Sequence, residues 1–479
     1  MRKSIFLFLI LSTSIFSQNF LKVDSLDKKL IALTYNDEYE KVKSICDSLI
    51  KLDKKNPKYY FHYFSSDALE LHEKINLSSI NGRDSLREIL VNESIAKLED
   101  AIQILDDIPI TPTNRFYIAS LHGYYSRYAG LNGSWWAAYV NGIKANGMFE
   151  DLIDEFPECY DAYLYPGIFS YYAARLNGFT GFIASILGVS GNRTEGLTFI
   201  NLAVKNSKLV YAQALLMLIE INTVMEDNPN KAIGFFEEFI KIYPKNKRVL
   251  NWYCHTLLNL TQAKKVSTKI KNDNYGIVDN FVKAKYYFIT NQVDSSAKYA
   301  SCAFQNPNTW KGIIEHTKYY CVYTNWLNKN PDAIKIYKSK LNDFYVALFE
   351  LDLKNEAESK YIYKLTTLLA TENYSAFNKL ILKQPKFLEK YYIAEFNLLQ
   401  GISLFQQNKK IEALPFFEKA EISTDKRNKT IALRFQLDVY LKENVQLYKA
   451  RILIKKIEEA DYNKLTFRLE DLETKYKQN

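Results

Sequence analysis

The sequence predicts an all-α fold in which helical hairpins stack into a right-handed solenoid. Only 16 Gly and 11 Pro occur in 479 residues, which is too few turn residues for a β-sandwich or barrel. Apolar residues recur at helical spacing along most of the chain, and strand-like alternation is rare. The length exceeds what one ordinary core requires. An apolar fraction of 47% and a charged fraction of 24% are typical of a folded chain.

Residues 1–17 have the composition of a secretory signal peptide. Met1-Arg2-Lys3 precedes a short apolar run that ends at Phe16, and Ser17 supplies a small residue at the break. The run is shorter than the roughly 20 residues needed to span a bilayer. We therefore expect an exported protein that is periplasmic or secreted, with association with the outer membrane as a further option. The alternative interpretation is a buried N-terminal helix.

Residues 18–110 are expected to form N-terminal helical repeats. Asn-Pro steps that mark helix starts occur in this region and also later in the chain. Four Asn-Pro steps each place a helix-capping residue before a proline that suits the first helical turn. Short polar joints between the periodic runs predict consecutive antiparallel helices. The four steps begin at Asn56, Asn228, Asn306 and Asn330.

Residues 207–479 carry the clearest internal repetition. Small and aromatic residues recur at fixed offsets, as expected where two helices approach closely and an aromatic ring fills the groove between them. One copy contains Ala232, Phe236, Phe239 and Pro244, a second contains Gly401, Ala413, Phe417 and Ala420, and a third contains Ala284, Tyr287, Ser296, Ala300 and Ala303. The pattern resembles degenerate tetratricopeptide (TPR-like) repeats.

Residues 111–206 form a central segment rich in glycine and aromatic residues. Eleven of the 16 glycines lie between Gly123 and Gly196. The run Gly167-Ile168-Phe169, followed by Gly188-Val189-Ser190-Gly191-Asn192-Arg193, is similar to a segment of exported bacterial tetratricopeptide proteins. It also resembles the tetratricopeptide family of the inclusion-body clearance protein of the mitochondrial outer membrane, which has Asp where this chain has Asn192. The resemblance implies a helical-repeat fold and an adaptor-like role, and it implies no catalytic residues.

The apolar stretch Ala162–Gly191 allows three interpretations. The first is a buried helix pair, the second is a surface that binds lipid or a partner, and the third is a membrane crossing. Each apolar piece alone is too short to span a bilayer. Gly188, Gly191 and Arg193 fit either an anion-binding nest at a helix start or a tight turn in which Arg193 pairs with Glu195.

The sequence contains no recognised catalytic motif, predicts no cofactor and has no histidine spacing that suits a metal. The five widely spaced cysteines are predicted to be buried thiols. Carboxylate catalysis needs no linear motif, so an envelope protein that binds or cleaves glycans is the alternative function. Its candidate acids are Glu150, Asp151, Asp154, Glu155, Glu158 and Asp161, whose spacing also fits one solvated helix face.

A basic stretch runs from Lys241 to Lys271 without an acidic residue, and Tyr243, Trp252 and Tyr253 are interleaved. Cations beside stacking rings suit a nucleic acid or an anionic sugar. We expect no nucleic-acid partner in an exported protein and favour a solvated face. The basic-patch residues are Lys241, Lys245, Lys247, Arg248, Lys264 and Lys265.

The function predicted from these observations is a non-enzymatic exported scaffold that presents side chains to a protein or peptide partner. Aromatic side chains offer a large contact area with little rotamer entropy to lose. The surface residues predicted to bind are Trp135, Trp136, Tyr171, Tyr172 and Arg175, with Arg193 at the turn described above.

Overall fold

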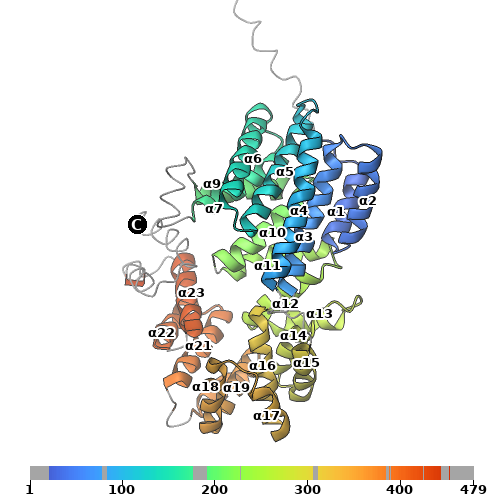
Figure 1. Ribbon diagram of the computed structural model, residues 1–479. Coiled ribbons are helices and arrows are strands. Elements are labelled where there is room, and N and C mark those ends of the chain that lie inside the picture. Colours follow the sequence, from blue (N-terminus) through green and yellow to red (C-terminus); the bar gives the residue numbers. More distant parts are fainter. Residues whose placement is uncertain are drawn as a thin grey trace, which may run out of the picture. The chain divides into compact units, whose positions relative to one another are not determined.

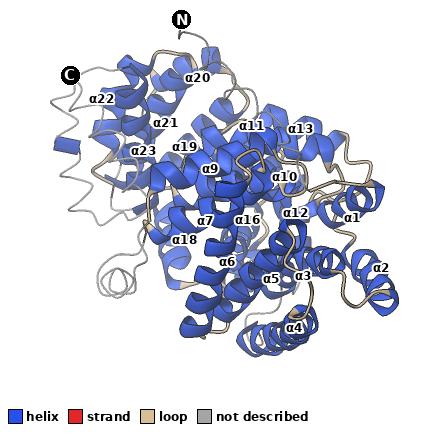
Figure 2. Cartoon of the chain, turned by 90° about the horizontal axis from the view of Figure 1, so that it is seen from above, coloured by secondary structure: helices blue, strands red, loops and turns tan. Residues whose placement is uncertain are grey.

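The computed structural model describes residues 21–77, 83–175, 191–226, 228–305, 311–384, 388, 390–423, 426–443 and 452–453. These residues form helices joined by short loops, and no strand occurs among them (Figures 1 and 2). The predicted signal peptide, the Asn306-Pro307 step and residues 176–190 lie outside this described part. The chain divides into two compact units, residues 1–218 with 242–244 and residues 219–241 with 245–479.

In the first unit the helices are α1 (Ser25–Tyr35), α2 (Tyr39–Leu52), α3 (Pro57–Leu77), α4 (Arg83–Leu105), α5 (Pro112–Leu131), α6 (Trp135–Glu155), a 3-10 turn (Tyr160–Tyr163), α7 (Leu164–Ala173), α9 (Arg193–Asn206) and α10 (Tyr211–Glu220), of which the last two residues belong to the second unit. Neighbouring helices pack as antiparallel pairs, most extensively α5 with α6 and α7 with α9.

In the second unit a π-helical turn (Ile221–Met225) leads to α11 (Pro229–Ile242), α12 (Lys247–Asn259), α13 (Ala263–Lys271), α14 (Asn280–Ile289), α15 (Val293–Gln305), α16 (Lys311–Leu327), α17 (Pro331–Lys338), α18 (Asp343–Lys354), α19 (Glu356–Ala370), α20 (Tyr374–Ile381), α21 (Lys390–Gln406), α22 (Lys410–Ala420) and α23 (Lys426–Glu443). Pairs such as α14–α15 and α21–α22 again form antiparallel hairpins.

Three of the four Asn-Pro steps begin helices, as predicted. Helices α3, α11 and α17 start at Pro57, Pro229 and Pro331. The side chain of Asn330 accepts a hydrogen bond from the backbone N–H of Ala333 at 3.3 Å, so the asparagine satisfies an N–H group that the helix itself leaves without a partner.

One turn geometry recurs within the hairpins of both units. After the first helix one residue has a positive φ, and the next N–H donates to the carbonyl five residues earlier, which is the hydrogen bond of a Schellman motif. This bond is 2.8 Å from Gln262 N to Leu257 O and 2.9 Å from Asn330 N to Asn325 O. The residues with positive φ are Asp37, Gly133, Thr261, Asn291, Lys329, Glu372 and Asn408.

These repeated turns, with the absence of strands among the described residues, confirm the predicted all-α class of helical-hairpin repeats. The right-handed winding stays a prediction. Most of the repeat positions chosen from the sequence also lie in the core, and Ala232, Phe236, Ala284, Ala300 and Phe417 are fully buried. Pro244 is exposed and Tyr287 is half-buried.

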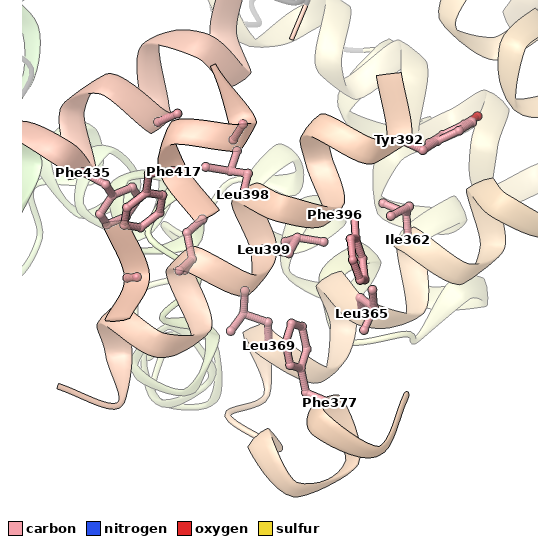
Figure 3. Packing of buried hydrophobic residues seen from close by; sticks show 14 of the residues in the cluster. Ile362, Leu365, Leu369, Phe377, Tyr392, Phe396, Leu398, Leu399, Phe417 and Phe435 are labelled. Atoms are coloured by element: carbon pink, nitrogen blue, oxygen red, sulfur yellow. The ribbon is translucent and has the colours of Figure 1, made fainter. Parts of the chain in front are cut away.

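The packing of a small residue against an aromatic ring is clearest in the core of α19–α23 (Figure 3). A Cβ placed on Gly401 would lie 2.5 Å from the Phe417 ring, so a small residue at this position is what lets the aromatic residue of the next helix pack. The Phe417 ring in turn stacks on Phe435, with centroids 4.9 Å apart and planes 5° apart. Small residue and ring therefore form one contact, which accounts for their fixed offset in sequence.

The cysteine prediction is correct for four residues and wrong for one. Cys46, Cys159, Cys254 and Cys321 are buried free thiols, whereas Cys302 is exposed. Burial raises the pKa of Cys46 to about 12, so this thiol stays protonated and packs as a small apolar group.

Replacing Lys329 by glycine is expected to raise the free energy of unfolding by about 0.5–1 kcal/mol. Lys329 is exposed and has a φ of 55°, a conformation that costs a residue with a Cβ but costs glycine nothing. Urea denaturation measures the change. Lys335→Gly, inside α17, is the control and should lose about 1 kcal/mol. Equal losses in both variants would contradict the role assigned to the turn.

A partly buried ionic cluster joins the start of α1 to α3. Asp24 and Asp27 form a capping box, Lys58 donates to Asp24 at 2.7 Å and to Asp27 at 2.9 Å, and His62 Nε2 lies 2.8 Å from the Asp27 carboxylate. Burial lowers the pKa of His62 although Asp27 opposes the shift. The folded state therefore holds this imidazole neutral.

Stability is expected to fall as the pH drops below about 6.5, the pKa of an unfolded histidine. The folded-state pKa of His62 is lower, so the unfolded chain binds more protons in this range, and the loss approaches about 1.4 kcal/mol per pH unit. Urea midpoints between pH 7.5 and pH 5 test this prediction. His62→Gln should flatten the slope without removing it, because the pKa of His122 is also lowered by burial. An unchanged slope in His62→Gln would refute the assignment.

Candidate functional site

A polar recess lies between α2, α3 and α4 in the first unit, with a volume of about 200 Å³. We call it the α2–α4 recess. Its lining combines three lysines, three acids, one tyrosine and one serine with two leucines. The residues are Lys43 of α2, Tyr63, Asp67, Glu70, Leu71 and Lys74 of α3, and Leu90, Glu93, Ser94 and Lys97 of α4.

Helical spacing brings these side chains to one place. Tyr63, Asp67, Glu70 and Lys74 follow one another at intervals of four, three and four residues, so they share one face of α3. Helix α3 packs against both α2 and α4. The polar face of α3 is therefore turned toward its neighbours at this point, where an isolated helix would turn it to solvent.

Glu70 is the electrostatic centre of the recess. Its carboxylate forms ion pairs with Lys43 and, at 2.6 Å, with Lys74. Burial alone would raise the pKa of Glu70, but the two lysines outweigh it and the pKa is lowered. The pKa of Lys43 is raised, because Glu70 outweighs the opposing effect of burial. Both groups are therefore charged at neutral pH.

Lys97 of α4 lines another side of the recess. Its ammonium lies 2.9 Å from the Asp47 carboxylate and 3.6 Å from the centroid of the Tyr63 ring, a cation–π distance. Asp67 accepts hydrogen bonds from Ser94 Oγ at 2.7 Å and from the Tyr128 hydroxyl at 3.0 Å. These contacts hold the polar groups in fixed positions before anything binds, which lowers the entropic cost of recognition.

Glu93 differs from the other acids of the recess. It is exposed at the rim, and it forms no ion pair or hydrogen bond within the part of the chain that the structure describes. An uncommitted carboxylate beside a preformed polar recess suits a cationic side chain of a bound peptide. The lining of the recess includes no histidine and no cysteine.

The sequence interpretation missed this recess. The only available indication was the Tyr63–Lys74 spacing, and a polar stripe of this kind on a helix is normally solvated. Only the packing of α4 against α3 distinguishes the two cases.

The predicted aromatic surface is partly correct in position. Trp135 and Trp136 begin α6 and are 74% and 68% exposed. Tyr171 was expected on the surface but is fully buried, because α7 crosses α9 so closely that the backbone of Tyr171 lies against Gly196. Tyr172 and Arg175 are half-buried. The Trp136 ring packs on Tyr139, with centroids 5.5 Å apart, and the binding roles stay predictions.

The segment around Gly191 forms a turn in its described part. A Cβ on Gly191 would lie 1.9 Å from the backbone nitrogen of Ala174, so only glycine fits against the end of α7. Asn192 caps α9 by accepting from Glu195 N at 3.1 Å, and Ser170 Oγ also approaches the Glu195 carboxylate at 3.1 Å. Half-buried Arg193 is the first residue of α9. Gly188 lies outside the described residues, and the anion-binding alternative stays a prediction.

Acids from other elements neutralise part of the predicted basic patch. Three of its lysines form ion pairs: Lys247 with Asp279 at 3.0 Å, Lys265 with Glu237 at 3.2 Å and Lys264 with Glu372 at 3.5 Å. Lys241 and Lys245 are exposed, Arg248 is half-buried, and the Lys245 ammonium lies 5.8 Å from the Tyr275 ring centroid.

The interleaved rings do not form a stacking platform. Tyr243 and Tyr253 are buried, and Trp252 packs edge-on against Phe236 with centroids 5.5 Å apart. These rings belong to the core of the hairpins, and the linear sequence could not show which acids would fold back toward the cations.

The candidate acids for glycan chemistry separate into two groups. Glu150, Asp151, Asp154, Glu155 and Glu158 are exposed, as expected of a solvated face, and Glu155 pairs with Arg115 at 2.5 Å. Asp161 is 1% exposed and accepts hydrogen bonds from the backbone N–H groups of Lys208, Leu209 and Val210 at 3.1, 2.6 and 3.0 Å. Asp161 therefore has a structural role.

Within the described residues, no cluster of three or more His, Cys, Asp or Glu side chains could hold a metal ion. The helices of the described part also include none that combines the length and apolar character needed to cross a membrane.

No family model matches the sequence, and no curated protein matches it. Among solved structures the chain is similar to the human IFIT1 dimer with m7Gppp-AAAA, at 12% identity over 96% of this chain and 95% of that one, with a TM-score of 0.31. Yeast Tom70 is similar at 14% identity over 90% and 91%, with a TM-score of 0.27. The Cut9–Hcn1 hetero-tetramer of APC/C gives 12% identity over 95% of each chain, with a TM-score of 0.22. TM-scores this low assign no family to the chain.

Proposed function

We propose that this protein is a non-enzymatic helical-repeat scaffold that is exported to the cell envelope and binds a protein or peptide partner there. The α2–α4 recess is the observation that carries the proposal. It offers a preformed polar cavity with one uncommitted carboxylate at its rim, and its lining supplies charged and hydrogen-bonding groups for recognition.

The partner segment that suits the recess is a short extended or helical peptide with a basic side chain. Glu93 would pair with that side chain, and the remaining lysines and acids would exchange hydrogen bonds with the peptide backbone. A cavity of about 200 Å³ holds one side chain, not a whole ligand. Binding would then depend on several contacts along the helical array, as is usual for repeat proteins.

The test is affinity capture from an envelope extract with the wild-type chain and two charge-reversed variants. Glu93→Lys places a cation at the recess, whereas Glu88→Lys reverses an exposed acid of the same helix that does not line the recess. We expect one protein to be retained by the wild type and by Glu88→Lys and to be lost from Glu93→Lys.

Two results would refute the proposal. Equal retention by both variants would remove the recess from recognition, and retention of a polysaccharide in place of a protein would favour the glycan-binding alternative. Export is tested separately by N-terminal sequencing of the mature protein, which should begin after Ser17.

A further inference from the structure

An exposed apolar stripe runs along the first half of α6. Trp135 and Trp136 are followed one and two turns later by Val140 and Ile143, which are 44% and 39% exposed. Residues 136, 140 and 143 are spaced by four and three positions, so they lie on one face of the helix. Other strongly exposed apolar side chains, such as Leu52 and Leu382, have no exposed large apolar neighbour within a turn of the chain, and single exposures need no explanation.

In the chain segment that carries this stripe, the charged residues are all positive. Between Ile108 and Phe149 the chain contains no Asp or Glu, and its cations are Arg115, Arg127 and Lys144. Arg115 pairs with Glu155 at the far end of α6. Arg127 and Lys144 are exposed, and neither forms an ion pair with a described residue.

These two cations flank the stripe. Lys144 directly follows Ile143, and Arg127 follows Ser126, whose hydroxyl donates to the carbonyl of Ala138 at 2.7 Å. That hydrogen bond places Arg127 level with the middle of the stripe. Acids return only in the second half of α6, beginning at Glu150, so the helix has an apolar, cationic half followed by an acidic half.

We propose that the first half of α6 docks onto the surface of an anionic phospholipid membrane. Tryptophan suits the interface because its ring is largely apolar while its N–H remains hydrogen-bonded to headgroups or water. Rings that protrude from a helix need no matching cavity in a fluid bilayer, and Arg127 and Lys144 would meet the lipid phosphates. The acidic second half of α6 would limit insertion to its first turns. This attachment is separate from peptide recognition in the α2–α4 recess.

The experiment uses the full chain with vesicles of phosphatidylcholine alone and of phosphatidylcholine mixed with phosphatidylglycerol. Flotation measures binding, and quenching of tryptophan fluorescence by brominated lipid measures insertion. We expect stronger binding to the phosphatidylglycerol vesicles, with partial loss as salt screens the cations.

Three double variants locate the contact. Trp135→Ala with Trp136→Ala should weaken binding about tenfold or more and abolish quenching, since two rings lose their apolar burial. Arg127→Gln with Lys144→Gln should remove the preference for phosphatidylglycerol. The control Leu52→Ala with Leu382→Ala, which truncates apolar residues elsewhere that are even more exposed, should bind as the wild type does.

Failure of the wild type to bind either vesicle would overturn the proposal, as would undiminished binding of the tryptophan variant. If the tryptophan variant instead loses the captured protein partner while the wild type ignores vesicles, the stripe is a protein interface and the membrane proposal is wrong. Circular dichroism melts confirm that each variant is folded. Glu93→Lys should float as the wild type does, so failure of peptide recognition and failure of membrane docking are distinguishable.

Discussion

Replacing Gly196 by alanine is expected to lower the free energy of unfolding by about 3 kcal/mol, because the new methyl group has no space at the crossing of α7 and α9. A Cβ on Gly196 would lie 2.6 Å from Tyr171 N, 2.7 Å from the Gly167 carbonyl oxygen and 2.9 Å from Tyr171 Cα. All three atoms belong to the backbone, so no side-chain rotation relieves the clash and the helices must separate.

The crossing depends on glycine from both helices. A Cβ on Gly167 of α7 would lie 3.0 Å from the Gly196 carbonyl oxygen. Separation would also disturb Ile200, which is fully buried on α9. Urea denaturation of Gly196→Ala, followed by far-ultraviolet circular dichroism, measures the loss.

Gly147→Ala is the matched control. Gly147 is also a helical glycine in the first unit, but a Cβ there meets nothing within 4 Å. The free energy of unfolding of this variant should rise by about 0.5–1 kcal/mol, because alanine has a better helix propensity than glycine. A loss in Gly196→Ala no larger than 1 kcal/mol would show that the two helices do not pack as closely as described.

The sequence was sufficient to predict the fold class because the helices obey local rules. Prolines 57, 229 and 331 start helices in the structure, since an Asn-Pro step supplies both a cap and a compatible φ angle. The small residue and ring at Gly401 and Phe417 were found from offsets alone, because their contact spans two helices of one hairpin.

The hairpin turns were less visible in the sequence. Most of their positive-φ positions hold residues such as Asp37, Thr261 and Glu372, where a glycine would have marked the turn. The hydrogen bond to the carbonyl five residues earlier offsets the cost of a positive φ at these residues. The backbone therefore adopts the turn without the glycine that a sequence search looks for.

The candidate site was predicted least well, because exposure and pairing are properties of tertiary packing. Tyr171 and Trp136 look equivalent in an aromatic segment, yet one is fully buried and the other is 68% exposed. Likewise, Lys265 lies in a run without acids but pairs with Glu237 from a different helix. Local patterns cannot supply this information.

Replacing Asp161 by alanine removes its carboxylate and is expected to lower the free energy of unfolding by about 4 kcal/mol. Its oxygens accept the N–H groups of three consecutive residues, Lys208, Leu209 and Val210, just before α10. Leu209 and Val210 are buried, so water cannot readily replace the lost acceptor. Each buried donor without a partner costs about 1–3 kcal/mol.

Burial raises the pKa of Asp161, and the three N–H donors offset only part of that effect. The buried carboxyl is therefore retained despite an unfavourable environment, which fits a structural requirement for an acceptor at this point. Asp161→Asn keeps one oxygen as an acceptor and should lose about half as much stability as Asp161→Ala.

Asp154→Ala is the control for Asp161→Ala, because Asp154 is an exposed acid near the end of α6 and should change stability by less than about 0.5 kcal/mol. Urea midpoints of the three variants give the comparison. If Asp161→Ala were as stable as Asp154→Ala, the start of α10 would not depend on the buried carboxylate. Retained stability, with glycan cleavage lost in Asp161→Ala, would instead return this acid to the catalytic alternative.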